Sequence, residues 1–302
     1  MEILPGLDTF VLVGRTGSIS GAARALGVPR STVSRRLARL ESELGEVLLD
    51  RSSRSAHLTE AGRLLLERGA PLVAALRSLE DDVRQLGGEP RGAIRVCAMP
   101  GLGIRFLSEF LRGLRERWPD LRPELLVREH PPSLLDEGFD VVITESSSDP
   151  GPYHVHVLGP ADRVVVTHPG RLREQAPRLA DLAALPCLGV DGPADRADLW
   201  PLRNGESVPV RPALRSNDLT VVREAALSGL GFALLPLFAV GLDLLGGDLV
   251  IALPEVGRSA TLVALTSRPA EESPKVAAFL SLVEEFRERY AGPEIDRLVS
   301  ER

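Results

Sequence analysis

The apolar positions near the start of the chain recur at the spacing of an α-helix. One segment has apolar residues at intervals of four, three and four, namely Val33, Leu37, Leu40 and Leu44. Because residues three or four apart lie on the same face of a helix, this spacing predicts one buried stripe. The opposite face of the segment carries hydroxyl and guanidinium groups, so it is predicted to meet solvent or a polar partner.

A shorter apolar-periodic segment precedes this helix and is predicted to be a second one. Ser20 is a suitable N-cap for it, and Gly27 with Val28 is expected to turn the chain. Pro29 then suits the first turn of the next helix, where its missing N–H is not needed. Two helices joined by such a tight turn predict a helix-turn-helix domain.

The segment that follows predicts a short hairpin. Residues 46–59 read EVLLDRSSRSAHLT, a Ser-rich polar stretch between two strand-like ends. A hairpin in this place would form a wing beside a DNA duplex. We therefore expect a winged helix-turn-helix domain over residues 1–58.

The distribution of charge is informative in one segment of the chain. The chain has a formal net charge of -6 at pH 7, yet residues 15–40 hold six Arg and no acid. Such a patch suits a surface that meets phosphates. The alternative is an ordinary amphipathic helix with a solvated Arg face. That alternative does not explain why a helix, a turn, a second helix and a basic face occur together in this order. The residues predicted to contact DNA are Arg30, Ser31, Thr32, Ser34, Arg35, Arg36 and Arg39 on the helix, with Arg51 and Arg54 in the hairpin.

A long helix with a heptad pattern is predicted next, over residues 59–86, with Thr59 as its N-cap. Pro71 lies inside it and is expected to bend the axis near Arg68. The stripe predicts a short coiled-coil seam and hence a homodimer, unless it packs on the chain's own domain. The residues predicted to form the seam are Leu65, Leu72, Leu76, Leu79, Val83 and Leu86.

The pattern changes to alternating strands and helices after residues 87–92, GGEPRG, whose composition is that of a hinge. Helices are predicted over 103–117, 218–228 and 274–290. The apolar runs predicted as strands are AIRVCA, ELLVRE, FDVVIT, RVVVT, CLGV, GFALLP, LVIAL and TLVAL. The fold class is therefore α/β over most of the chain, with enough residues for two small lobes.

The segment TGSISGAARALGVPRSTVSRRLARLESELG, followed by LLDR and LTEAG, resembles the amino-terminal signature of LysR-type transcriptional regulators. The resemblance continues in family order through NDLTVVREAALSGLGFALLP and SPKVAAFLSLVEEF, so it covers nearly all of the chain. Two departures stand out. Pro29 and Arg30 replace the usual Ser and Gln, which favours guanine or phosphate over adenine, and Leu49 replaces the usual Phe in the core.

The resemblance implies a domain plan and a set of partners. It implies a linker and dimerisation helix with a hinge over 59–90 and a periplasmic-binding-protein-like effector domain over 91–302. Lobe one would comprise 91–162 and 268–302, and lobe two 163–267. The implied partners are double-stranded DNA, a small-molecule effector, RNA polymerase and further copies of the chain, as a homodimer or homotetramer. The rival interpretation is a small-molecule sensor whose amino-terminal domain binds proteins instead of DNA.

Three places at strand ends or helix starts qualify as effector sites, because ligands of such sheets lie at the carboxyl ends of strands. Free backbone N–H groups there would suit a carboxylate, although ordinary helix capping explains each place alone. Pro100 and Gly101 stand where the family often has a hydroxyl. The candidate residues are Met99, Pro100, Gly101, Leu102, Thr144, Glu145, Ser146, Ser147, Asn217, Asp218 and Thr220.

No catalytic residue, metal ligand or cofactor is predicted. His154 and His156 form the one close histidine pair and are interpreted as residues of a surface strand, since no metal-binding spacing accompanies them. Cys97 and Cys187, the only cysteines, are flanked by apolar residues and are predicted to be buried thiols. The alternative is a redox switch, which would require exposed thiols with positive charge nearby.

The same scarcity of cysteine, with no signal peptide in the first residues, predicts a reduced, cytoplasmic protein. Residues 225–242 lack charges but are interrupted by Gly and Pro. They are predicted to form the end of a helix, a buried strand and the start of another helix, and the chain is not expected to enter a membrane.

Overall fold

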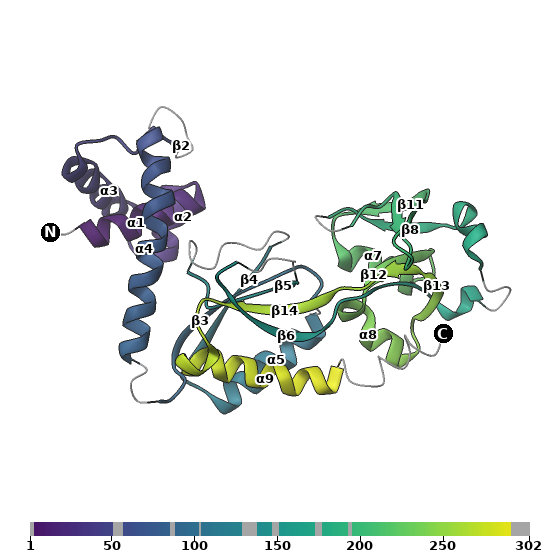
Figure 1. Cartoon of the computed structure of the whole chain (residues 1–302). Coiled ribbons are helices and arrows are strands. Elements are labelled where there is room, and N and C mark those ends of the chain that lie inside the picture. The colour runs from purple at the N-terminus through teal and green to yellow at the C-terminus, as the bar shows by residue number, and fades with distance from the viewer. Residues whose placement is uncertain are drawn as a thin grey trace. The chain divides into compact units, whose positions relative to one another are not determined.

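The computed structural model of the chain consists of two compact units (Figure 1). The first comprises residues 1–87 with 132–139, and the second 88–131 with 140–302. The residues that the structure describes are 3–50, 57–84, 88–102, 104–128, 138–146, 151–172, 177–192 and 195–290.

The first unit begins with three helices, α1 (Ile3–Thr16), α2 (Ile19–Leu26) and α3 (Arg30–Leu44). Gly27 ends α2 in the left-handed conformation at φ 63°, as the predicted turn requires. The N-cap of α2 is Ser18, whose hydroxyl accepts a hydrogen bond from Gly21 N, so the prediction of Ser20 was wrong by two residues.

Three of the four residues in the predicted α3 stripe are buried, since Val33, Leu37 and Leu40 are at most 2% exposed. Leu44 is 40% exposed, which corrects the prediction. It is the last residue of α3 before Gly45 turns the chain at φ 71°, so the helix ends beyond the core. Pro29 occupies the N-cap of α3 instead of its first turn.

The predicted hairpin is present at its base. Strands β1 (Leu49–Asp50) and β2 (His57–Leu58) pair antiparallel. The helix α4 (Glu60–Arg84) follows, and Thr59 caps it by accepting a hydrogen bond from Gly62 N through its hydroxyl at 3.0 Å. Pro71 lies inside α4, and the predicted bend there stays a prediction.

The second unit contains two five-stranded sheets (Figure 1). The first has the order β4-β3-β5-β14-β6, and α5 (Ile104–Arg117) and α9 (Pro274–Tyr290) lie together along it. Its strands are β3 (Gly92–Ala98), β4 (Leu121–Val127), β5 (Val141–Glu145), β6 (His154–Pro160) and β14 (Thr261–Thr266).

The second sheet has the order β11-β8-β12-β7-β13, with α7 (Leu219–Leu227) and α8 (Leu237–Gly246) packed on one face. The short pair β9 (Leu199–Pro201) and β10 (Ser207–Pro209) contributes to the cluster on the other face. The strands of the second sheet are β7 (Arg163–Thr167), β8 (Cys187–Val190), β11 (Pro212–Ser216), β12 (Phe232–Pro236) and β13 (Val250–Arg258).

The chain crosses between the sheets twice, after β6 and after β13. The second sheet begins with β7 at Arg163. The predicted return at 268 was too late, because β14 pairs with β5 and β6 of the first sheet from Thr261 onward. The run TLVAL was assigned to the wrong lobe since an apolar strand pattern does not tell which sheet a strand joins.

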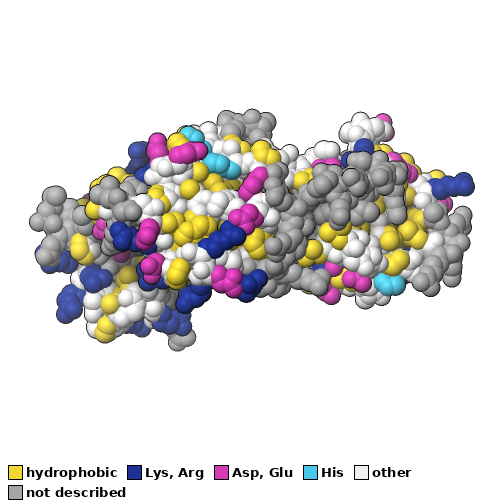
Figure 2. All heavy atoms as spheres, turned by 90° about the horizontal axis from the view of Figure 1, so that it is seen from below, with side chains coloured by type: hydrophobic (Ala, Val, Ile, Leu, Met, Phe, Trp, Pro, Cys, Tyr) yellow, Lys and Arg dark blue, Asp and Glu magenta, His cyan; other side chains and the backbone are white. Residues whose placement is uncertain are grey.

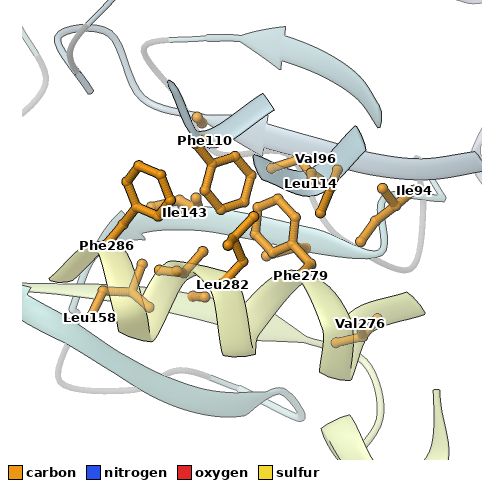
Figure 3. Packing of buried hydrophobic residues seen from close by; sticks show 14 of the residues in the cluster. Ile94, Val96, Phe110, Leu114, Ile143, Leu158, Val276, Phe279, Leu282 and Phe286 are labelled. Carbon is orange, nitrogen blue, oxygen red and sulfur yellow. The ribbon is translucent and has the colours of Figure 1, made fainter. Parts of the chain in front are cut away.

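Aromatic residues from α5 and α9 fill the core against the first sheet (Figure 3). The ring of Phe110 meets Phe279 and Phe286 edge-on, with centroids 4.9 Å and 5.7 Å away. This packing joins α9 to the lobe that is built on the first sheet.

The uncharged run 225–242 forms the end of α7, strand β12 and the start of α8, as predicted. Within the described ranges, no helix combines the length and apolar character that crossing a membrane requires.

Candidate DNA interface and effector site

The polar face of α3 is exposed opposite its buried stripe. Arg30, Ser31, Ser34 and Arg35 are all exposed, while Thr32 is half-buried. The exposed face of α3 therefore presents guanidinium and hydroxyl donors on one side of a rigid helix, as phosphate and base contacts require. In the view of Figure 2, Lys and Arg side chains (dark blue) are exposed alongside acidic and hydrophobic ones.

Two other arginines of α3 already have partners within the unit. Arg36 is half-buried, and its Nη1 donates to the Thr9 hydroxyl at 3.4 Å. Arg39 Nε donates to the Glu43 carboxylate at 3.0 Å. The structure therefore separates Arg36 from the exposed group that the sequence suggested. Arg51 and Arg54 lie outside the described residues.

An exposed apolar stripe runs along α4. Leu72, Leu79 and Val83 are 63%, 57% and 59% exposed, which is unusual for large apolar residues on one heptad face. Leu76 is half-buried, Leu65 contributes to the core of the first unit, and Leu86 lies outside the described residues. Within the described part of the chain, the stripe therefore lacks the cover that a coiled-coil partner would supply.

The face of α4 next to α1 is closely packed through two glycines. A Cβ at Gly14 of α1 would lie 2.9 Å from Leu66 Cδ2, and one at Gly69 of α4 would lie 2.7 Å from Leu7 Cδ1. Each helix thus receives a leucine of the other against a glycine. The contact joins α4 to the helix-turn-helix along a face that borders the exposed stripe.

The structure brings two of the predicted effector segments together. Gly101 has φ +85°, and a Cβ there would lie 2.7 Å from Cδ1 of Leu219, the first residue of α7. Met99 and Leu102 pack against the core of the first lobe, and Pro100 is half-buried. The approach between the lobes at this point is apolar.

The segment at the start of α7 shows ordinary capping. Asp218 is the N-cap, and its carboxylate accepts a hydrogen bond from Thr220 N at 2.8 Å, while Ser216 Oγ accepts one from Asp218 N. Asn217 is exposed. Capping accounts for these side chains, so their presence does not by itself indicate a ligand.

Glu145, one of the predicted effector residues at the end of β5, belongs to a cluster of four charges whose other three members sequence reasoning missed. Glu145 Oε1 lies 2.5 Å from Arg163 Nη2, and Oε2 accepts from Arg258 Nη2 at 3.0 Å. Arg163 also donates from Nη2 to Asp195 at 2.7 Å. The cluster joins strands of the two lobes, because Glu145 belongs to the first sheet and the two arginines to the second.

Arg163 is only 2% exposed and stays charged. Burial acts to lower its pKa, but the carboxylates of Asp195 and Glu145 outweigh this effect and raise the pKa above its ordinary value. No local pattern indicates the other three members, since they lie far from Glu145 in the chain. Thr144 is half-buried, Ser146 N donates to Thr261 O, and Ser147 lies outside the described residues.

Both cysteines are buried, as predicted, and they are not joined in a disulfide. Burial raises the pKa of Cys187 to about 11, which disfavours the reactive thiolate. His156 Nε2 lies 3.1 Å from the Thr266 hydroxyl, and burial lowers its pKa. Among the described residues, no group of three or more His, Cys, Asp or Glu side chains is placed to hold a metal ion.

Comparison with known proteins agrees with this architecture. Residues 4–63 match the bacterial regulatory helix-turn-helix protein, lysR family, and residues 87–288 match the LysR substrate binding domain. The chain is similar to the HTH-type transcriptional activator TtdR of Escherichia coli K12, with 30% identity over 89% of each chain. It is also similar to the HTH-type transcriptional regulator DmlR of the same strain, with 29% identity over 96% of each.

Solved structures show the same fold. The full-length virulence activator AphB of Vibrio cholerae superposes with a TM-score of 0.61 and 25% identity, covering 94% of this chain and 98% of that one. The regulator CrgA of Neisseria meningitidis gives a TM-score of 0.59 and 26% identity, with 93% and 98% covered. The chain belongs to the LysR family of DNA-binding transcriptional regulators, and its second unit is the effector-binding domain of that family.

Proposed function

We propose that the exposed face of α3 reads the operator and that α4 pairs two chains on it. The observation that carries the proposal is the group Arg30, Ser31, Ser34 and Arg35, which is exposed at the start of α3 while the opposite stripe is buried. A dimer would present two such faces to a two-fold symmetric site, with half-sites about one helical turn apart or more, ~34 Å.

The uncovered leucines of α4 support the pairing of two chains. Burying a large exposed apolar side chain contributes roughly 1.5–3 kcal/mol, so the stripe favours association with a second copy. Whether two pairs assemble into a tetramer is decided by surfaces other than this stripe. A regulator that binds chromosomal DNA in this way works in the bacterial cytoplasm.

The proposed effector is a small molecule bound between the lobes of the second unit. The cluster of Glu145, Arg163, Asp195 and Arg258 supports a carboxylate, because guanidinium groups at this crossing already hold two carboxylates. An acidic effector would compete with Glu145 for Arg258, which is 30% exposed. We further propose activation through RNA polymerase, since the relative TtdR is named a transcriptional activator.

The test is a footprint of the full-length protein on the duplex upstream of its own gene, over a series of salt concentrations. We expect a protected two-fold site with a steep salt dependence and a change in its length when a small carboxylic acid binds. Arg35→Ala should weaken binding by ~1–3 kcal/mol without unfolding the chain. The control Arg112→Ala removes an equal charge from an exposed ion pair of α5 and should leave the footprint unchanged.

Equal binding by the Arg35→Ala variant and the wild type would contradict the proposed reading face. An absence of protection at low salt, with small-molecule binding intact, would instead favour the sensor whose amino-terminal domain binds proteins.

A further inference from the structure

One carboxylate, that of Glu41, holds the chain where α3, the hairpin and α4 meet. Its Oε1 accepts a hydrogen bond from Leu48 N at 2.9 Å and a second from Leu49 N at 3.3 Å. Glu41 lies near the end of α3, and Leu49 is the first residue of β1. The carboxylate therefore binds the first strand of the hairpin directly to the helix that carries the DNA-reading face.

The other side of the same segment is bound to α4. Leu48 O accepts from Thr59 N at 3.0 Å, and Val47 O accepts from the Thr59 hydroxyl at 2.7 Å. That hydroxyl also accepts from Gly62 N and so caps α4. Leu48 thus has its N–H bound to α3 and its carbonyl bound to the start of α4, while its side chain is buried at 1% exposure.

The segment also has no room to shift toward α4. A Cβ at Gly62 would lie 2.2 Å from Leu48 O, so the first turn of α4 rests against the backbone itself. Since this neighbour is a backbone atom and no flexible side chain, the contact is rigid. The hairpin base is fixed from both helices at once.

Helix stability does not explain an acid in this position. The carboxyl end of a helix is the negative end of its dipole, where a carboxylate is unfavourable and a cation is preferred. The last turn of α3 nevertheless contains no basic residue. The favourable term is the pair of charge-assisted hydrogen bonds to Leu48 and Leu49, whose N–H groups would otherwise lie unpaired next to a buried core.

We propose that Glu41 is a positioning residue that sets the place of the hairpin base, β1 and β2, relative to the reading face of α3. The inference rests on the proposed function, because it concerns how two parts of one DNA interface are kept in register. Loss of the carboxylate releases the hairpin base while α3 keeps its buried stripe. Wing contacts to the sugar–phosphate backbone are then lost before the base contacts of α3.

The test compares Glu41→Ala, Glu41→Gln and the matched control Glu46→Ala in the full-length protein. Glu46 is an exposed acid of the same loop, so its loss changes the local charge equally. The probe is the duplex upstream of the chain's own gene. Hydroxyl-radical cleavage reports backbone contacts, guanine N7 methylation reports contacts in the major groove, and the salt dependence of affinity counts phosphate contacts.

For Glu41→Ala we expect protection of guanine N7 to remain at saturating protein, while backbone protection beside it is lost. The slope of log affinity against log salt should become less steep, because fewer phosphates are contacted. Glu41→Gln keeps one acceptor oxygen and should show a smaller loss. Thr59→Ala, which frees the same segment from the α4 side, should lose the same backbone protection.

Two results would overturn the inference. One is a footprint and salt slope for Glu41→Ala equal to those of Glu46→Ala. The other is a parallel loss of both kinds of protection together with a lower melting temperature, which would mean that Glu41 only stabilises the domain. Failure of the wild type to protect the duplex is a different outcome, and it would contradict the proposed function from which the inference starts.

Discussion

The thiol of Cys187 shows how a single buried residue links the stability of this protein to pH. It lies in the central part of the second sheet, on β8, and its surroundings are apolar. Burial alone raises its pKa from the usual 9.0 to about 11. The folded state therefore keeps the proton over a range in which the unfolded chain loses it.

We expect the effector domain to lose stability between pH 9 and pH 11. In that range the unfolded state binds fewer protons than the folded state, so the free energy of unfolding falls as pH rises, by up to about 1.4 kcal/mol per pH unit. Chemical denaturation at several pH values measures the effect. Cys187→Ala should flatten the dependence, and an equal slope in the variant and the wild type would show that other groups cause it.

At the scale of elements, α4 has two faces with different partners. The face with Ala70 and Val73 packs on Leu7 and Val11 of α1, and the neighbouring face carries the exposed leucines. This division explains how one helix can belong to the DNA-binding unit and still offer a seam to a second chain. A helix that is apolar on more than one face needs more than one partner.

Charged substitutions on the exposed face should separate the chains. We expect Leu72→Glu and Leu79→Glu to convert the dimer to a monomer, because each would bury a carboxylate in an apolar seam. Sedimentation velocity of the full-length protein measures the change. Leu64→Glu is the matched control, since Leu64 is 59% exposed on the same helix but lies off the heptad positions. Unchanged association in the two seam variants would mean that dimers form through another surface.

At the scale of the whole molecule, the second unit is held together where the chain crosses between its sheets. Arg163, the first residue of β7, meets carboxylates from both lobes, and Ala161 N donates to Ala260 O between the two crossing segments. The cluster pairs two guanidinium groups with two carboxylates, so its net charge is zero. A buried cation with this many partners is strongly coupled to them.

Removing that cation should destabilise the effector domain strongly. Arg163→Ala leaves Glu145 and Asp195 with the partly exposed Arg258 as their shared cation, and breaking a buried pair in this way costs roughly 3–5 kcal/mol. Trp118 and Trp200 are the only tryptophans and both belong to the second unit, so their fluorescence follows its unfolding alone. The surface variant Arg112→Ala should change stability by less than about 1 kcal/mol. Similar denaturation midpoints for the two variants would argue against the proposed coupling.

The sequence by itself determined the order of elements, because local patterns encode it. Val33, Leu37 and Leu40 predicted the face of α3, Gly27 predicted the turn, and Thr59 predicted the start of α4. These features depend on spacing and on capping chemistry within a few residues. The exposed heptad positions of α4 belong to the same class.

Only the tertiary structure decided which distant residues meet. The four-charge cluster brings together Glu145, Arg163, Asp195 and Arg258, which are far apart in the sequence. The strand TLVAL pairs with the first sheet, and such a pairing also depends on contacts between distant parts of the chain. The partner of Arg36 and the two bonds of Glu41 were equally hidden. A side chain's chemistry is written in the sequence, but its partner is chosen by packing, since burial and distance exist only in the folded chain.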